Sequence, residues 1–145
     1  MNISFSGSNI SPLLLQAYLE TNYNVYGPVS LNLRIGVSNP ALGILHQANR
    51  VDSSAFLTAV NPYSQNLNEA ANTKRQVLLA AELKRLKLIF IDGMGQHPSG
   101  KWPGEPSFLV FGLDQAGAKI LGENFEQNAI IWNGSDAVPR LILLR

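Results

Sequence analysis

Residues 55–62 read Ala-Phe-Leu-Thr-Ala-Val-Asn-Pro, and this stretch decides the fold class. Its apolar residues follow one another without alternation and only Thr58 interrupts them, which is typical of a central strand covered on both faces. The strand is expected to stop at Asn61-Pro62. A strand of this kind belongs to a sheet that has helices packed against it.

Elements of both kinds follow this strand. A long helix is predicted over residues 68–86, because Ala, Leu, Gln, Glu, Lys and Arg dominate it and neither Gly nor Pro interrupts it. Asp114 is an N-cap residue that opens a further helix. The C-terminal part is typical of a β-hairpin around the turn-like residues 133–136. The elements predicted after residue 62 are the helix 68–86, the strands 88–92 and 107–113, the helix 115–125, and the paired strands 129–132 and 140–144.

Periodicity and capping signals also define the elements upstream. Residues 29–36 alternate, with Val, Leu and Ile on one face and Ser, Asn and Arg on the other, as in a half-buried strand. Two pairs of a capping residue and a proline each open a helix. The elements predicted before residue 55 are a helix that begins at Ser11-Pro12 and ends at Asn22 and Asn24, the strand 29–36, and a short helix from Asn39-Pro40 to about Asn49.

The order of these elements predicts the fold. Strands and helices are interleaved, but two pairs of strands follow each other directly. This mixture favours an α+β fold (α/β-like), with a mixed β-sheet, three to four helices packed on it and a C-terminal β-hairpin. No linker, like-charge run or repeat divides the sequence. Residues 1–145 are therefore expected to form a single globular domain, with residues 1–10 as a flexible N-terminal arm.

Composition limits the classes of function. The chain carries 11 Lys+Arg against 10 Asp+Glu, a net charge of +1, which argues against electrostatic capture of nucleic acid or acidic membranes. The absence of cysteine excludes thiol catalysis, disulfides and Cys-ligated zinc. Residues 1–11 lack the pattern of a secretory signal, and no apolar run is long enough to span a membrane. We therefore expect a cytoplasmic protein, and its oligomeric state stays open.

The long helix carries two polar residues on its predicted core face. At 100° per residue, Leu79, Leu83 and Leu86 share one face, and Asn72 and Arg75 continue it toward the N-terminus. Because a buried guanidinium needs a partner, one hypothesis is a site for a ligand carboxylate or phosphate at the helix start. The alternative is that Arg75 pairs with an internal carboxylate such as Glu105 and holds a loop in place.

Further polar residues stand at the ends of predicted strands, where open α/β sheets bind ligands. Thr58 and Asn61 end the central strand, and Gln127 and Asn128 precede a strand of the hairpin. All four are candidates for ligand binding. The alternatives are a turn-forming role for Asn61, a strand residue without function for Thr58, and hydrogen bonds to neighbouring backbone for the two other amides.

Residues 93–106 hold four Gly and three Pro, which predicts a long functional loop. His97 and Glu105 on this loop are candidates for acid–base catalysis. Trp102 is a candidate lid aromatic, or else a residue that anchors the loop in the core. His46, near the end of its short helix, is expected to be a surface or helix-capping residue and not a ligand.

Cofactor and metal motifs are missing from the sequence. Gly93-Met94-Gly95 lacks the third Gly, the Lys and the following helix of a dinucleotide or P-loop motif. The two histidines are 51 residues apart and belong to no metal-binding pattern. We expect no cofactor and no metal.

Several strings resemble the bacterial family called domain of unknown function 3293. They are Leu15-Gln-Ala-Tyr-Leu-Glu-Thr with Tyr23, Phe56-Leu-Thr-Ala-Val-Asn-Pro-Tyr-Ser, Gly93-x-Gly95 with Pro98, Trp102-Pro-Gly-Glu-Pro-Ser-Phe-Leu, and Phe125-x-Gln-Asn-Ala. The resemblance extends over nearly the whole chain, although Val60 stands where the family often has an aromatic residue. It implies a small, single-domain, cytosolic bacterial protein and directs attention to the polar residues within these strings.

Three functions fit these candidates. The first is binding of a small anionic or nucleotide-like ligand in a polar pocket, and the second is a small hydrolase-type enzyme that uses Glu105 and His97, with Arg75 as an electrostatic stabiliser. The third is a protein–protein interaction or regulatory module of the kind that mobile elements carry, with the Trp102 loop as its contact. The residues predicted for the pocket are Thr58, Asn61, Asn72, Arg75, Trp102, Glu105, Gln127 and Asn128.

Overall fold

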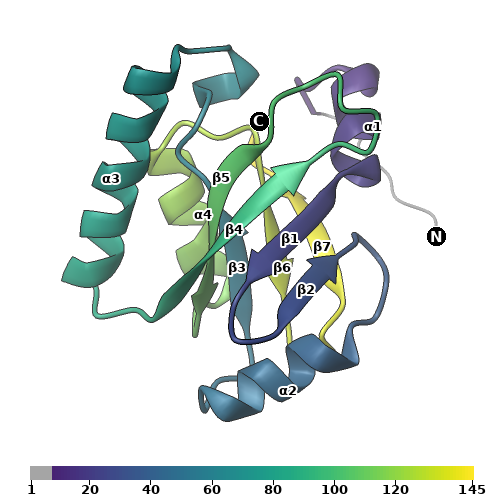
Figure 1. Cartoon of the computed structure of the whole chain (residues 1–145), viewed down its shortest axis with the longest axis vertical. Helices are drawn as coiled ribbons and strands as arrows, with labels where there is room; N and C mark the ends of the chain where they lie inside the picture. The colour runs from purple at the N-terminus through teal and green to yellow at the C-terminus, as the bar shows by residue number, and fades with distance from the viewer. Residues whose placement is uncertain (1–7) are drawn as a thin grey trace.

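Seven strands form one sheet in the computed structural model, which describes residues 8–145 (Figure 1). The elements are α1 (Pro12–Glu20), β1 (Asn22–Tyr26), β2 (Ser30–Leu33), α2 (Pro40–Ala48), β3 (Ser54–Leu57), a 3₁₀ turn (Pro62–Ser64), α3 (Glu69–Arg85), β4 (Phe90–Gln96), β5 (Glu105–Phe111), α4 (Gln115–Asn124), β6 (Ala129–Asn133) and β7 (Pro139–Leu143). The strand order is β2-β1-β4-β5-β3-β6-β7. This is a single α+β domain with the predicted C-terminal hairpin.

All pairings in the sheet are antiparallel, which corrects the expected mixed sheet. A mixed sheet requires that a helix connect two strands that become neighbours. Here α3 connects β3 to β4, and β5 lies between them. Likewise α4 connects β5 to β6, and β3 lies between them. Each of these two connections therefore passes over one antiparallel strand, and no parallel pair forms.

Strand β1 was not predicted, because Asn22 and Asn24 resemble a helix end. In the structure Tyr23 and Val25 alternate with these asparagines and are buried, while β1 pairs with both β2 and β4. The alternation extends over only five residues, and partner strands on both sides offset the low strand propensity of asparagine.

The sheet curls until its two edges approach each other. The Gly36 amide, just after β2, donates to the Pro139 carbonyl of β7 at 2.8 Å, and the Asn39 amide donates to the Ala137 carbonyl at 3.0 Å. The curl gives the sheet an inner and an outer face, each with its own core. The inner core includes Val25, Leu33, Phe56, Leu109 and Ile131, together with Leu42 of α2 and Leu19 of α1. The outer core includes Leu57, Phe108, Val110 and Ile130, with Leu79 and Leu83 of α3 and Leu121 of α4.

The helices begin where the sequence predicts. Ser11, Asn39, Asn68 and Asp114 each cap a helix, and each side chain accepts a hydrogen bond from a backbone amide in the first turn. The core face of α3 is shorter than expected, because Leu86 is its C-cap residue and is 41% exposed. Among residues 8–145, no helix has both the length and the apolar character needed to cross a membrane.

The N-terminal arm lies only partly within the described residues. Residues 1–7 are outside them. Ile10 is buried, and the Ser8 hydroxyl donates to the Arg145 carbonyl at 2.9 Å. The part of the arm that the structure describes is therefore packed against the domain.

The predicted loop 93–106 is shorter than expected, since β4 continues to Gln96 and β5 begins at Glu105. Gly93 belongs to the sheet because it pairs with Val25 of β1 and Ser107 of β5, and close packing at this position demands a residue without a side chain. A Cβ atom on it would lie 2.6 Å from the Asn24 carbonyl oxygen and 2.7 Å from the Phe56 ring. Only residues 97–104 form the loop.

Replacing Gly93 with alanine should destabilise the fold. The methyl group would have to displace the backbone of β1 and the Phe56 ring, and overpacking of this kind costs about 1–3 kcal/mol. Gly95→Ala is the matched control in the same strand, because the nearest atoms to its Cβ lie at 3.8 Å. Urea denaturation measures both free energies of unfolding. Equal losses in the two variants would contradict this interpretation of Gly93.

His46 is buried, which corrects its expected place at the surface. Its Nε2 and the Ser54 hydroxyl are joined by a 2.7 Å hydrogen bond, and Asn133 Nδ2 donates to the same hydroxyl at 3.0 Å. Helix α2 is amphipathic at this position and turns His46 toward the inner face. Burial lowers the pKa of His46 below its ordinary value.

This burial predicts a pH-dependent contribution to stability. The unfolded chain binds a proton on His46 near pH 6.5, whereas the folded chain does so only at lower pH, so the contribution is complete above pH 6.5 and is lost as the pH falls below it. His46→Gln should therefore reduce the acid dependence of stability between pH 7 and pH 5, by up to about 1.4 kcal/mol per pH unit. Denaturation of both proteins across this range measures the difference. Parallel curves would contradict the prediction.

Candidate functional site

A cavity of about 650 Å³ opens inside the curl, where α1 and the loop 97–104 cover the inner face (Figure 1). We call it the inner cavity. Its size is typical of small-molecule sites. Asn72 and Arg75 do not line it. The other predicted site residues do: Thr58, Asn61, His97, Trp102, Glu105, Gln127 and Asn128.

The antiparallel pairing explains why these residues meet. Thr58 and Asn61 follow the end of β3, Glu105 begins β5, and residues 127–128 precede β6. Because β5 and β6 both run antiparallel to β3, the start of each lies beside the end of β3. Three segments far apart in the sequence thus bring polar side chains to one edge of the sheet.

Glu105 is the only Asp or Glu among the described residues that line the inner cavity. Asn61 Nδ2 donates to its Oε2 at 2.9 Å. Within residues 8–145 no donor reaches its other oxygen, Oε1. Burial raises the pKa of Glu105, and the hydrogen bond from Asn61 opposes this effect. Glu105 therefore offers a ligand one acceptor oxygen in a desolvated place.

Asn72 positions Asn61 instead of lining the cavity as predicted. Asn72 Nδ2 donates to Asn61 Oδ1 at 2.8 Å, and Asn72 Oδ1 accepts from the Asn61 backbone amide at 2.9 Å. The Leu67 amide also donates to Asn61 Oδ1, at 3.0 Å. With its oxygen held in this way, the Asn61 amide nitrogen is directed to Glu105.

Thr58 and Gln127 use part of their hydrogen-bonding capacity on the backbone. The Thr58 hydroxyl donates to the Pro106 carbonyl at 2.7 Å and accepts from the Val60 amide at 3.1 Å. Gln127 Nε2 donates to the carbonyls of Val60 and Phe125. The Gln127 oxygen has no donor within the described residues, so it stays available to a ligand.

A second network of side chains joins Tyr18 to Ser64, and the sequence did not predict that these two residues would lie together. The hydroxyl groups of Tyr18 on α1 and Ser64 are joined at 2.7 Å, and Asn128 Nδ2 donates to both, at 3.3 and 2.9 Å. Burial raises the pKa of Tyr18. Arg145 Nη1 donates to Asn128 Oδ1 at 3.3 Å. Neither contact has a signal in the sequence, because 46 and 110 residues separate Tyr18 from Ser64 and Asn128.

The backbone beside the cavity is strained. Asn61, Tyr63 and Ser64 have φ values of 50°, 51° and 59°, which place three residues with side chains in the left-handed region. A 2.7 Å hydrogen bond from the Tyr63 amide to the Glu126 carbonyl helps to hold this turn. Strain of this kind is concentrated at functional sites, where the surrounding structure stabilises it.

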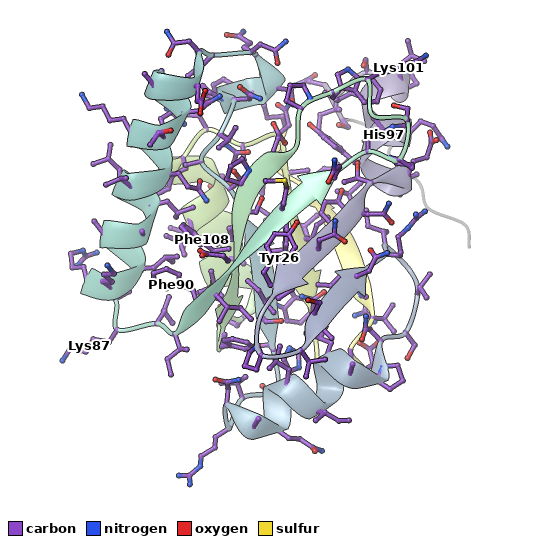
Figure 2. All side chains as sticks on the ribbon, viewed as in Figure 1. Tyr26, Lys87, Phe90, His97, Lys101 and Phe108 are labelled. Carbon is purple, nitrogen blue, oxygen red and sulfur yellow. The ribbon has the colours of Figure 1, made fainter. Side chains whose placement is uncertain are left out.

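His97, Lys101 and Trp102 line the inner cavity from the loop 97–104 and form its mouth. Figure 2 shows His97 and Lys101 on this loop beside α1. His97 Nε2 lies 3.8 Å from Glu20 Oε2, and its Nδ1 is hydrogen-bonded to the Ser99 hydroxyl at 2.8 Å. Trp102 is 52% exposed and packs edge-on against the His97 ring at 4.5 Å, so it does not anchor the loop in the core. Among the described residues no hydrogen bond joins His97 to Glu105.

Arg75 holds a loop in place, as the alternative hypothesis stated, but its partner is not Glu105. Its Nε donates to the Ala59 carbonyl and its Nη2 to the Phe125 carbonyl, both at 2.6 Å. Its Nη1 pairs with Glu126 Oε1 at 3.3 Å. The guanidinium thus links the segments that follow β3 and α4 and does not reach the inner cavity.

The described residues contain no group of three or more His, Asp or Glu side chains that could hold a metal ion. In the inner cavity only Glu105 and His97 have strong metal-ligating groups, and their hydrogen-bonding partners differ.

Removing the Arg75 side chain should destabilise the fold. The loss of charge-assisted hydrogen bonds to two carbonyls predicts a decrease of about 2–3 kcal/mol in the free energy of unfolding for Arg75→Ala. Lys74→Ala is the control, because Lys74 is exposed on the same helix turn, and it should change stability by less than about 0.5 kcal/mol. Chemical denaturation compares the two. A change for Arg75→Ala as small as the control would refute the anchoring role.

Comparison with known proteins adds one finding. No curated protein and no solved structure matches the chain. The family described as "Protein of unknown function (DUF3293)" matches residues 57–130. This range contains every residue that the sequence predicts for the site, whereas the strings at Leu15 and Tyr23 lie outside it. The match spans 74 of the 145 residues, from 57 to 130, and the chain therefore belongs to the DUF3293 family of proteins of unknown function.

Proposed function

We propose that this protein binds a small nucleotide-like molecule in the inner cavity, and that it does so in the bacterial cytoplasm. The observation that carries the proposal is the partly buried carboxyl group of Glu105, which has one oxygen fixed by Asn61 and the other free. A ligand with ring N–H groups would donate to that free oxygen.

The energetics of burial support a donor on the ligand. A carboxylate loses favourable hydration when it is buried, and hydrogen bonds must offset that loss. Asn61 supplies one bond, and a ligand N–H would supply a second, which is strengthened because a bound ligand displaces water from the carboxyl group. The oxygen of Gln127 and the hydroxyl groups of Tyr18 and Ser64 would accept or donate further bonds.

The charges at the mouth support an anionic group at the other end of the ligand. Arg75 was the expected partner for an anion, but its guanidinium is bonded elsewhere. The positively charged group that lines the inner cavity is Lys101, and His97 lies beside it on the same loop. A nucleotide-like ligand would therefore place its base at Glu105 and its phosphate at the mouth.

The enzyme hypothesis has less support. Acid–base catalysis by Glu105 and His97 would need both groups within reach of one reacting proton. The two nitrogens of His97 face Glu20 and Ser99, on the side of α1 and the loop. We therefore propose a binding function and assign no catalytic step.

A thermal-shift series with Glu105→Gln tests this function. Guanosine and uridine monophosphates, whose bases carry a ring N–H, should raise the melting temperature of the wild type, since a ligand at about 100 times its Kd adds roughly 2.7 kcal/mol of stability. Ribose 5-phosphate and inorganic phosphate, which lack the ring N–H groups, should give little or no shift. Glu105→Gln should lose the response to the nucleotides, and Glu123→Gln, an exposed acid on α4, should keep it.

The same variant separates a functional role of Glu105 from a structural one. Because its pKa is raised, Glu105 contributes stability that is present below its ordinary pKa of 4.5 and is lost as the pH rises through the raised value. At neutral pH, Glu105→Gln should therefore be as stable as the wild type or more stable. A marked loss of stability, or a nucleotide response that survives the substitution, would overturn the proposed site.

A further inference from the structure

A second hollow, of about 800 Å³, lies on the outer face of the sheet, between α3 and the strands β1, β4 and β5. In Figure 2 Phe108 lies between α3 and the strands, and Tyr26 lies over the strands. We call this hollow the outer groove and define it by six of its residues: Tyr26, Glu69, Gln76, Val77, Asp92 and Phe108. It is distinct from the inner cavity, although both border on Asn61, Asn66, Pro103 and Ser107.

The charged residues that line the outer groove are all acidic. They are Glu69 at the start of α3 and Asp92 on β4, and no Lys, Arg or His lines it among the described residues. Both carboxylates are exposed, and neither has an ion-pair partner within residues 8–145. The whole chain carries a net charge of +1, so the negative charge of this region differs from the nearly neutral charge of the protein as a whole. It favours a cationic partner.

The rim of the outer groove is apolar. Tyr26 is 52% exposed and Val77 is 62% exposed, although each borders a groove whose floor contains the buried Phe108. Aromatic and aliphatic side chains around a concave surface are typical of sites where a partner buries apolar groups. The partner should therefore combine positive charge with apolar side chains.

Gln76 supplies a third kind of contact. Its Oε1 accepts from the Ala59 amide at 3.0 Å, but its Nε2 is buried and has no partner within the described residues. Buried donors without a partner are rare in folded proteins. Because this nitrogen is shielded from solvent, a carbonyl group in the outer groove supplies the missing acceptor once the Gln76 amide turns toward the groove.

We propose that the outer groove docks a segment of another protein chain that carries Lys or Arg next to apolar side chains. The basic groups pair with Glu69 and Asp92, and the apolar side chains cover Tyr26 and Val77. A backbone carbonyl accepts from Gln76 Nε2 after the amide turns into the groove. A polypeptide offers all three groups along one extended segment, whereas a free amine offers only the charge. The proposal is independent of the nucleotide-binding function, because Glu69, Val77 and Asp92 do not line the inner cavity.

Fluorescence anisotropy with synthetic peptides tests this proposal. The probe is a short labelled peptide of alternating lysine and leucine, and a glutamate–leucine peptide is its counterpart. The wild type should bind the lysine peptide and not the glutamate peptide, and added salt should weaken the binding. The double variant Glu69→Gln/Asp92→Asn should weaken it at least about threefold, as expected for two exposed ion pairs. Val77→Ser should weaken it as well.

A matched control separates the groove from general electrostatics. Asp52→Asn/Glu123→Gln changes the net charge by the same amount through exposed acids that do not line the outer groove. Equal weakening by both double variants, absence of binding, or equal affinity for the glutamate peptide would overturn the proposal. Displacement of the lysine peptide by spermidine at comparable concentration would identify a free amine as the occupant and would overturn it too.

Sedimentation of the unliganded protein completes the test. Self-association that Glu69→Gln/Asp92→Asn abolishes would make a second copy of this chain the occupant and overturn the proposal. A monomer at all concentrations, together with selective loss of peptide binding, is the expected result. The melting-temperature response to nucleotides should be the same in this double variant as in the wild type.

Discussion

The packing of Phe56 against Gly93 and Tyr23 inside the curled sheet is the contact on which the rest of the structure depends. The Phe56 ring meets Tyr23 edge-on at 5.4 Å and fills the space that a side chain on Gly93 would occupy. On one side of it, Leu33, Leu42 and other apolar residues form the inner core. On its other side the polar residues begin, and the inner cavity opens. The ring is thus both the edge of the core and a wall of the site.

The inner cavity depends on interactions that offset the cost of withdrawing the Glu105 carboxyl group from water and of the strained turn beside it. A buried carboxyl group is costly, and a turn with three left-handed residues adds strain. Asn72 and Arg75, which do not line the cavity, offset these costs. Asn72 fixes Asn61, and Arg75 links the segments after β3 and α4. The polar residues nearest to the site therefore divide into those that face a ligand and those that hold the facing residues in position.

The local elements were largely predictable, because their signals are contained in a few neighbouring residues. Caps such as Asn39 and Asn68, the alternation in β2 and the apolar run of β3 each depend on contacts within one turn or one strand. The sequence-based prediction was wrong for elements that are stabilised by partner strands far away in the sequence. Strand β1 gains its stability from β2 and β4, and Gly93 is a strand residue because it pairs with β1 and β5. These partners cannot be identified from the local sequence.

The sequence by itself determined an α+β domain with a C-terminal hairpin and a set of polar residues at element ends, because capping, periodicity and composition are local properties. It also determined that Arg75 needs a partner, since a guanidinium on a core face cannot be left unpaired. Only the tertiary structure decided which partner that is, which polar residues share a cavity, and that Tyr18 and Ser64 join them. Strand order and the curl bring these residues together, and both depend on contacts between segments far apart in the chain, which local sequence patterns do not encode.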